Sequence, residues 1–146
     1  MSESILHKEL KHRAAIYLLN KGYWICGEEV PMPVGICDAW GMKRWDKDTM
    51  AIEVKASRAD FRSASQRYKE ISEFILGNHQ YILCPDNLIH PIDVHPSWGL
   101  LWWNGSRMVN KKKAMRVEMT AENKLDTLQY FLNNGMNAAR PRFPTL

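Results

Sequence analysis

Asp38, Glu53 and Lys55 are the residues whose types and spacing could do chemistry in this sequence. Glu53 and Lys55 are two residues apart in the apolar stretch 51–57, and alternate side chains of a strand share a face, so both project to the same side. Asp38 lies in an upstream stretch that is also typical of a strand, and residues 41–50 are enough to turn the chain back. Two carboxylates and an ammonium group would then converge. Such a cluster can hold a hard divalent cation beside a phosphate, which is the chemistry of phosphodiester hydrolysis.

Two elements are expected before the strand that carries Asp38. Apolar residues recur at helical spacing from residue 4 to residue 21, and Gly22 follows where a C-terminal cap would lie. Residues 23–30 are typical of a strand, and Pro31 and Pro33 predict the point where that strand leaves the sheet. A helix and a strand therefore precede the central hairpin.

A helix and a buried strand are expected after Lys55. Ser57 and Asp60 match the capping box that opens a helix, which should run to about Leu76. Residues 80–85 form a compact apolar run, as expected of a buried strand that lies parallel to its predecessor across that helix. The order predicts a βαβ crossover.

The last third of the chain predicts a hairpin and one more helix. Asn104 and Gly105 suit a two-residue turn, and Trp102 and Trp103, which are adjacent on the strand before it, must point to opposite faces. Residues 120–133 have helical periodicity, and residues 136–146 are expected to form an irregular tail. The leucines predicted to face inward from this helix are Leu125, Leu128 and Leu132.

The motif residues resemble the signature of the PD-(D/E)xK nuclease superfamily, which has the restriction-endonuclease-like fold. The runs 29–33, 52–57 and 60–62, together with Asp38, are similar to the MmcB-like group of proposed DNA-repair nucleases, over roughly residues 5–110. The resemblance implies an α/β fold with an αβββαβ core and a mixed central sheet flanked by helices. The C-terminal hairpin and helix are additions to that core. The chain departs from the pattern at Cys37, where proline is frequent, and at Gln66 and Glu70, where lysine and tyrosine are expected.

The resemblance also assigns roles to the residues of the central hairpin. Asp38 and Glu53, with the backbone carbonyl of Val54, would hold Mg²⁺, for which Mn²⁺ can substitute, and Lys55 would position the attacking water. Glu29 and Glu9 are further candidate metal ligands. Glu29 could equally be an exposed charge at a strand end. For Glu9, a surface pair with Arg13, four residues further along the helix, is the preferred explanation.

Two basic groups could bind the backbone of a nucleic acid. Helical spacing places Arg58, Arg62 and Lys69 together as a ridge that begins directly after the motif, and Gln66 lies on the same helix. The second group is Lys111, Lys112 and Lys113. Either group could instead be a solvated surface, and for the ridge we favour phosphate contact.

Composition agrees with a nucleic-acid partner and bounds the alternatives. With 146 residues, a net charge of +4 and a pI near 9.0, the chain is expected to form one domain, residues 1–146. Three cysteines without a CxxC pair argue for a reducing compartment and for core positions, and no apolar run is long enough to predict a membrane segment. We therefore expect a cytoplasmic protein without a membrane partner.

The function expected from these features is that of a magnesium-dependent nuclease, with DNA as the favoured substrate, in repair, recombination or the processing of phage or mobile elements. If both strands of a duplex are cut, a homodimer is expected, because each small subunit would carry one site. The alternative is a catalytically silent nucleic-acid-binding module with the same fold. A protein-protein adaptor that uses the tryptophans is a third possibility, supported only by composition.

Overall fold

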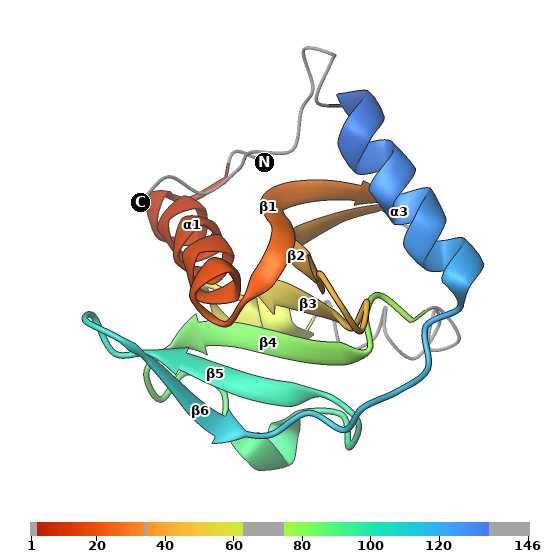
Figure 1. Ribbon diagram of the computed structural model, residues 1–146. Coiled ribbons are helices and arrows are strands. Elements are labelled where there is room, and N and C mark those ends of the chain that lie inside the picture. The colour runs from red at the N-terminus through yellow and green to blue at the C-terminus, as the bar shows by residue number, and fades with distance from the viewer. Residues whose placement is uncertain (1–2, 34, 63–74, 135–146) are drawn as a thin grey trace.

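The computed structural model describes residues 3–33, 35–62 and 75–134, which form a six-stranded mixed sheet with helices packed on it (Figure 1). The fold is therefore mixed α/β, as the sequence predicts. A further helix begins at Arg58 and is described as far as Arg62. The remaining elements, in chain order, are α1 (Ile5–Asn20), β1 (Tyr23–Met32), β2 (Gly35–Lys43), β3 (Thr49–Val54), β4 (His79–Pro85), the 3₁₀ helix η1 (Pro91–Asp93), β5 (Gly99–Trp103), β6 (Met108–Lys112) and α3 (Ala121–Asn134).

The strands lie in the sheet in the order in which they occur in the chain. β1, β2 and β3 are antiparallel, whereas β3, β4 and β5 are parallel, and β6 returns antiparallel to β5. Parallel neighbours need a long crossover connection, and residues 55–78, which include the start of the helix at Arg58, provide the one between β3 and β4. The predicted parallel arrangement of β4 is confirmed. The carboxyl ends of β3, β4 and β5 consequently meet at one edge of the sheet.

Each face of the sheet has its own hydrophobic core. Leu10, Ala14 and Leu18 of α1 pack against one face, where Ile52 and Val54 of β3 are buried. The other face contains Trp40, Ile82, Leu100 and Phe131 of α3. The helix α1 and the helix α3 therefore cover opposite faces of the sheet (Figure 1). Within the described ranges, no helix is both long and apolar enough to cross a membrane.

Trp102 and Trp103 confirm the predicted alternation. Trp102 is 8% exposed in the core beneath α3, and its indole Nε1 donates to the carbonyl of Ile89 at 2.7 Å. Trp103 packs at the edge of the core beneath α1, and the guanidinium carbon of Arg13 lies 4.8 Å from its ring centroid. The predicted core position of the cysteines is also confirmed, since Cys26, Cys37 and Cys84 are all buried with free thiols.

The first strand is longer than the sequence predicts. We expected it to leave the sheet at Pro31, but β1 continues to Met32, with Pro31 paired opposite Ile36. β1 is an edge strand of the sheet, and proline is tolerated there because its missing N–H is not needed by a second neighbour.

The turn between β5 and β6 also differs from its prediction. The hairpin is present, but Trp103 pairs with Met108, so four residues, 104–107, connect the strands where two were expected. The side chain of Asn104 accepts hydrogen bonds from the backbone N–H groups of Ser106 and Arg107, each at 2.9 Å. An asparagine side chain can thus stabilise a wider turn than the Asn-Gly pair alone suggests.

The inward face predicted for α3 is wrong for two of its three leucines. Leu125 and Leu132 are 64% and 73% exposed, and only Leu128 packs partly against the core. Phe131 is instead buried, with its ring centroid 6.2 Å from that of Trp40. We attribute the rotation of the helix to this contact, because an aromatic ring buries more apolar area than a leucine does.

Candidate active site at the carboxyl end of β3

Asp38 of β2 and Glu53 of β3 lie one position beyond Ala39 and Ile52, which pair across the two strands. The acids are close enough for the negative charge of Asp38 to raise the pKa of Glu53. One carboxylate oxygen of Asp38 also accepts a hydrogen bond from the backbone N–H of Val54 at 2.8 Å. The predicted convergence of the two acids is therefore present.

The pKa values of the two acids are raised by their surroundings. Burial raises the pKa of Glu53 from 4.5 to about 8, and the negative charge of Asp38 acts in the same direction. Burial also raises the pKa of Asp38, although the hydrogen bond from Val54 partly opposes this effect. Like charges held in a poorly solvated place favour a proton or a cation between them. The arrangement is thus suited to capturing positive charge.

Lys55 lies beside both acids, as the two-residue spacing predicts. Its backbone N–H donates to the carbonyl of Leu83 at 2.9 Å, which holds the chain against β4 beyond the end of β3. Its ammonium group lowers the pKa of Asp38 and of Glu53 and so opposes the effect of burial. Asp38, Glu53 and Lys55 therefore form one electrostatic cluster at the edge where the parallel strands end.

His7 is a member of this site that sequence reasoning missed. Its Nε2 donates to the carbonyl oxygen of Val54 at 3.1 Å and lies 3.8 Å from an oxygen of Asp38. Its Nδ1 is 2.6 Å from the carboxylate of Glu3. The N-cap of α1 fixes this first turn, because the hydroxyl of Ser4 accepts from the backbone N–H of His7 at 3.0 Å. No local pattern pointed to His7, since its partner on β3 is 47 residues away.

A buried lysine extends the polar network along α1. Lys11 is 5% exposed, and its ammonium lies 2.5 Å from Glu3 and 2.8 Å from Glu29. Glu29 has the left-handed backbone angle φ 57°, which non-glycine residues rarely adopt and which often marks functional sites. Its carboxylate is directed to Lys11. Glu9 pairs with Arg13 at 3.9 Å on the exposed side of α1, in agreement with the preferred explanation from the sequence.

The donor atoms at this site suit a hard cation. Mg²⁺ is commonly held by one or two carboxylates and completes its coordination with water, and Asp38 and Glu53 supply two carboxylates. The carbonyl of Val54, the third expected ligand, accepts a hydrogen bond from His7. Across residues 3–33, 35–62 and 75–134, no group of three or more His, Cys, Asp or Glu side chains is placed to hold a metal ion. The two acids therefore fit magnesium in type, with few protein ligands.

The two predicted basic groups lie in different places. Arg58 and Arg62 are exposed on the first turns of the helix that follows β3, and the hydroxyl of Ser57 caps this helix by accepting from the N–H of Asp60 at 3.1 Å. Gln66 and Lys69 lie outside the described residues. The exposed Arg58 thus follows the candidate site by three residues.

Lys111–Lys113 lie at and directly after the end of β6, the outermost strand on the side of the sheet away from β1. Lys112 pairs with Leu100, and the register across β3, β4, β5 and β6 puts it level with Glu53. Three strand spacings separate the two residues, a distance of about 14 Å across the sheet. Its ammonium donates to the carbonyls of Val94 and His95, and the ammonium of Lys111 lies 4.6 Å from the ring centroid of Trp102. The structure does not bring this group to the acids.

Comparisons with known proteins find a similar fold and indicate no activity. No protein-family model matches the chain, and no curated protein matches it. Among solved structures, the chain is similar to the SPO1766 protein of unknown function from Silicibacter pomeroyi, with a TM-score of 0.67 and 20% sequence identity. The similarity covers 87% of this chain and 84% of that one. At this level of identity, the likeness concerns the fold alone.

Proposed function

We propose that this chain is a magnesium-dependent nuclease that hydrolyses phosphodiester bonds, with DNA as its favoured substrate. The observation that carries the proposal is the convergence of Asp38 and Glu53 one position beyond the Ala39–Ile52 pair of β2 and β3, with the ammonium of Lys55 acting on both acids. The order of the elements up to β4 also agrees with the αβββαβ core of the restriction-endonuclease-like fold, which is the fold we propose.

In this proposal each residue of the cluster has a separate task. Asp38 and Glu53 hold the cation, and the hydrogen bond from the backbone N–H of Val54 fixes the position of the Asp38 carboxylate. A magnesium ion held there would supply positive charge against the scissile phosphate and make a nearby water more acidic. Lys55 orients the attacking water and stabilises the negative charge that grows in the transition state. Arg58, which is exposed three residues after Lys55, contacts a flanking phosphate.

The second candidate function is nucleic-acid binding without turnover, by a module with the same fold. Two contacts favour it. His7 occupies the carbonyl of Val54, and Lys11 occupies the carboxylate of Glu29, so both groups already have partners in this conformation. Because a carbonyl oxygen has two lone pairs, a cation at Val54 would share this oxygen with His7 or displace the imidazole. Cleavage assays separate the two functions, because both require binding but only the nuclease requires the acids.

The deciding experiment is incubation of the full chain with labelled single-stranded, duplex and branched nucleic acids, in magnesium, manganese or chelator. Asp38→Asn and Glu53→Gln should each abolish metal-dependent cleavage, because each removes an anionic ligand. Glu9→Gln is the matched control, since Glu9 is an exposed acid paired with Arg13, and it should cleave like the parent. Cleavage by either site variant at the parental rate would overturn the assignment, and binding without any cleavage by the parent would establish the second function.

A further inference from the structure

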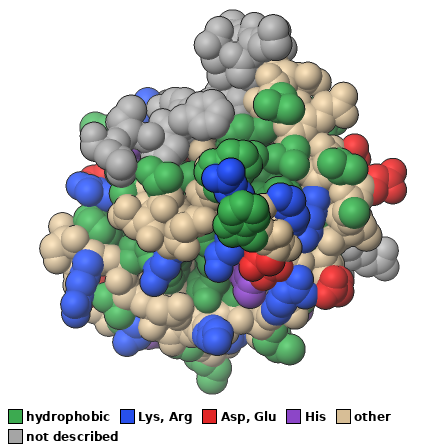
Figure 2. Space-filling model, in the orientation of Figure 1, with side chains coloured by type: hydrophobic (Ala, Val, Ile, Leu, Met, Phe, Trp, Pro, Cys, Tyr) green, Lys and Arg blue, Asp and Glu red, His purple; other side chains and the backbone are tan. Residues whose placement is uncertain are grey.

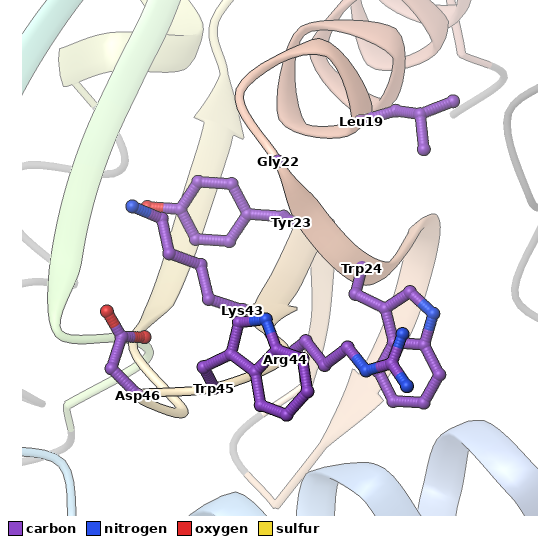
Figure 3. Close-up of a pocket in the computed structure, with 8 residues that line it drawn as sticks. All are labelled: Leu19, Gly22, Tyr23, Trp24, Lys43, Arg44, Trp45 and Asp46. Carbon is purple, nitrogen blue, oxygen red and sulfur yellow. The ribbon is translucent and has the colours of Figure 1, made fainter.

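A second surface that could bind a ligand lies at the end of the central strands opposite the candidate active site. Residues from the turn between α1 and β1 meet residues from the turn between β2 and β3, because Tyr23 pairs with Lys43. They surround a hollow of about 440 Å³ (Figure 3), lined by Leu19, Gly22, Tyr23, Trp24, Lys43, Arg44, Trp45 and Asp46. Glu53 is four residues along β3 from Thr49, which puts it about 13 Å from this end of the strand. The hollow is therefore separate from the candidate active site.

Two tryptophans in this hollow are exposed instead of packed. Trp24 is 59% exposed and Trp45 is 85% exposed. The guanidinium carbon of Arg44 lies 5.1 Å from the ring centroid of Trp24 and 4.8 Å from that of Trp45 (Figure 3). Stacking of a guanidinium against indole faces orders both rings without burying them. We call Trp24, Arg44 and Trp45 the stacking platform.

The surroundings of the platform are mainly basic. Lys43 and Lys47 flank Arg44, and the ammonium of Lys43 lies 5.4 Å from the ring centroid of Tyr23. Of the nearby acids, Asp46 lines the hollow together with Lys43 and Arg44, and Asp48 is paired with Arg116 at 2.8 Å and with His79 at 3.0 Å. Across the middle of the face in Figure 2, Lys and Arg side chains lie among exposed hydrophobic side chains, with acidic and histidine side chains beside them. The surface thus joins aromatic faces to excess positive charge.

We infer that the stacking platform binds unpaired bases of single-stranded nucleic acid. Every base has a π-face, so exposed tryptophans bind bases without regard to sequence, and neighbouring cations contact the phosphates. In duplex DNA the base faces are stacked inside the helix and are not accessible to an indole. The inference rests on the proposed nucleic-acid substrate and narrows it to one with a single-stranded segment. A protein segment or a second copy of the chain is the competing occupant, and charge complementarity favours the nucleic acid.

The test measures the anisotropy of a fluorescein-labelled oligothymidylate and of a labelled duplex, in chelator, with the full chain. Trp45→Ala and Trp24→Ala should each raise the Kd for oligothymidylate by roughly 5- to 150-fold, the range for loss of one stacked base, and leave the duplex Kd unchanged. Trp45→Phe, which keeps a smaller ring, should fall between. Ile92→Ala is the control, because Ile92 is 92% exposed but lies on η1, away from the platform.

Three results would overturn the inference. The first is a parent that does not bind oligothymidylate, and the second is a Trp24→Ala, Trp45→Ala double variant that binds it as the parent does. The third is a parental dimer in gel filtration that this double variant converts to a monomer without changing its Kd, which would make the platform a contact between copies. Because chelator prevents metal-dependent cleavage, the outcome is independent of the nuclease proposal. Binding to the platform by a chain that never cleaves would refute the nuclease and keep the platform.

Discussion

The raised pKa of Glu53 predicts how the stability of the metal-free protein depends on pH. The carboxyl group titrates at 4.5 under ordinary conditions and at about 8 in the native state, where burial and the charge of Asp38 disfavour ionisation. Between these values the native state retains a proton that the unfolded state has released. The stability that the Glu53 carboxyl group contributes is therefore fully present below pH 4.5 and is lost as the pH rises through about 8.

The size of this loss follows from the same two values. At about 1.4 kcal/mol per pH unit, raising the pKa from 4.5 to about 8 corresponds to at most roughly 5 kcal/mol of unfolding free energy. Glu53 is partly exposed, and solvent screening should reduce the observed loss to about 2 to 3 kcal/mol. Glu53→Gln removes the charge and keeps an oxygen to accept hydrogen bonds. We expect this variant to match the parent near the acid end of the range and to be more stable by this amount at the basic end.

Urea unfolding in chelator, from about pH 5 to about pH 9, measures the effect. Glu9→Gln is the control, because Glu9 is an exposed acid whose replacement should leave the pH dependence of the parent unchanged. Magnesium added at the basic end should stabilise the parent and not Glu53→Gln, since a ligand of the native state stabilises it by mass action. If the parent and Glu53→Gln lose stability in parallel across this range, Glu53 does not lie desolvated beside Asp38 and the reasoning fails.

Two further predictions concern catalysis and binding. Lys55→Ala should lower the single-turnover cleavage rate by a factor on the order of 10² to 10³ and should retain binding in chelator. The reason is that charge stabilisation specific to the transition state affects turnover rather than affinity. A variant that cleaves at the parental rate would exclude Lys55 from the mechanism. Replacing Arg58 and Arg62 with alanine should reduce the slope of log Kd against log salt on duplex DNA by about 0.9 per lost phosphate contact. If alanine at Lys111–Lys113 changes this slope and the arginine variant does not, the duplex lies over the β5–β6 hairpin instead.

Local rules were sufficient for the positions of several residues. The two-residue spacing of Glu53 and Lys55 predicted that their side chains would interact, as their charges do, and the capping pattern placed the start of the following helix directly after Ser57. The order of the elements followed from the same kind of reasoning, as did the opposite faces of Trp102 and Trp103. Each of these depends on spacing within a few residues, which the amino-acid sequence states directly.

The rotation of α3 and the extent of β1 depended on contacts between distant parts of the chain. Leu125 and Leu132 have suitable helical spacing, yet Phe131 packs against Trp40 and turns them outward. Local periodicity gives several apolar stripes on such a helix, and only the shape of the sheet below selects one. The continuation of β1 through Pro31 likewise required the knowledge that β1 is an edge strand.

One part of the candidate site follows from the sequence alone, and another part depends on the tertiary structure. The sequence by itself determined that Asp38, Glu53 and Lys55 could converge, because two adjacent strands joined by a turn have few alternative pairings. Only the tertiary structure brought His7 to the carbonyl of Val54 and Lys11 to Glu29. The packing of α1 on the sheet sets those distances, and it is decided by the burial of Leu10, Ala14 and Leu18, apolar residues with no chemistry of their own. A polar side chain carried on such a helix meets its partners wherever the apolar contacts place it, and short-range sequence patterns do not contain that information.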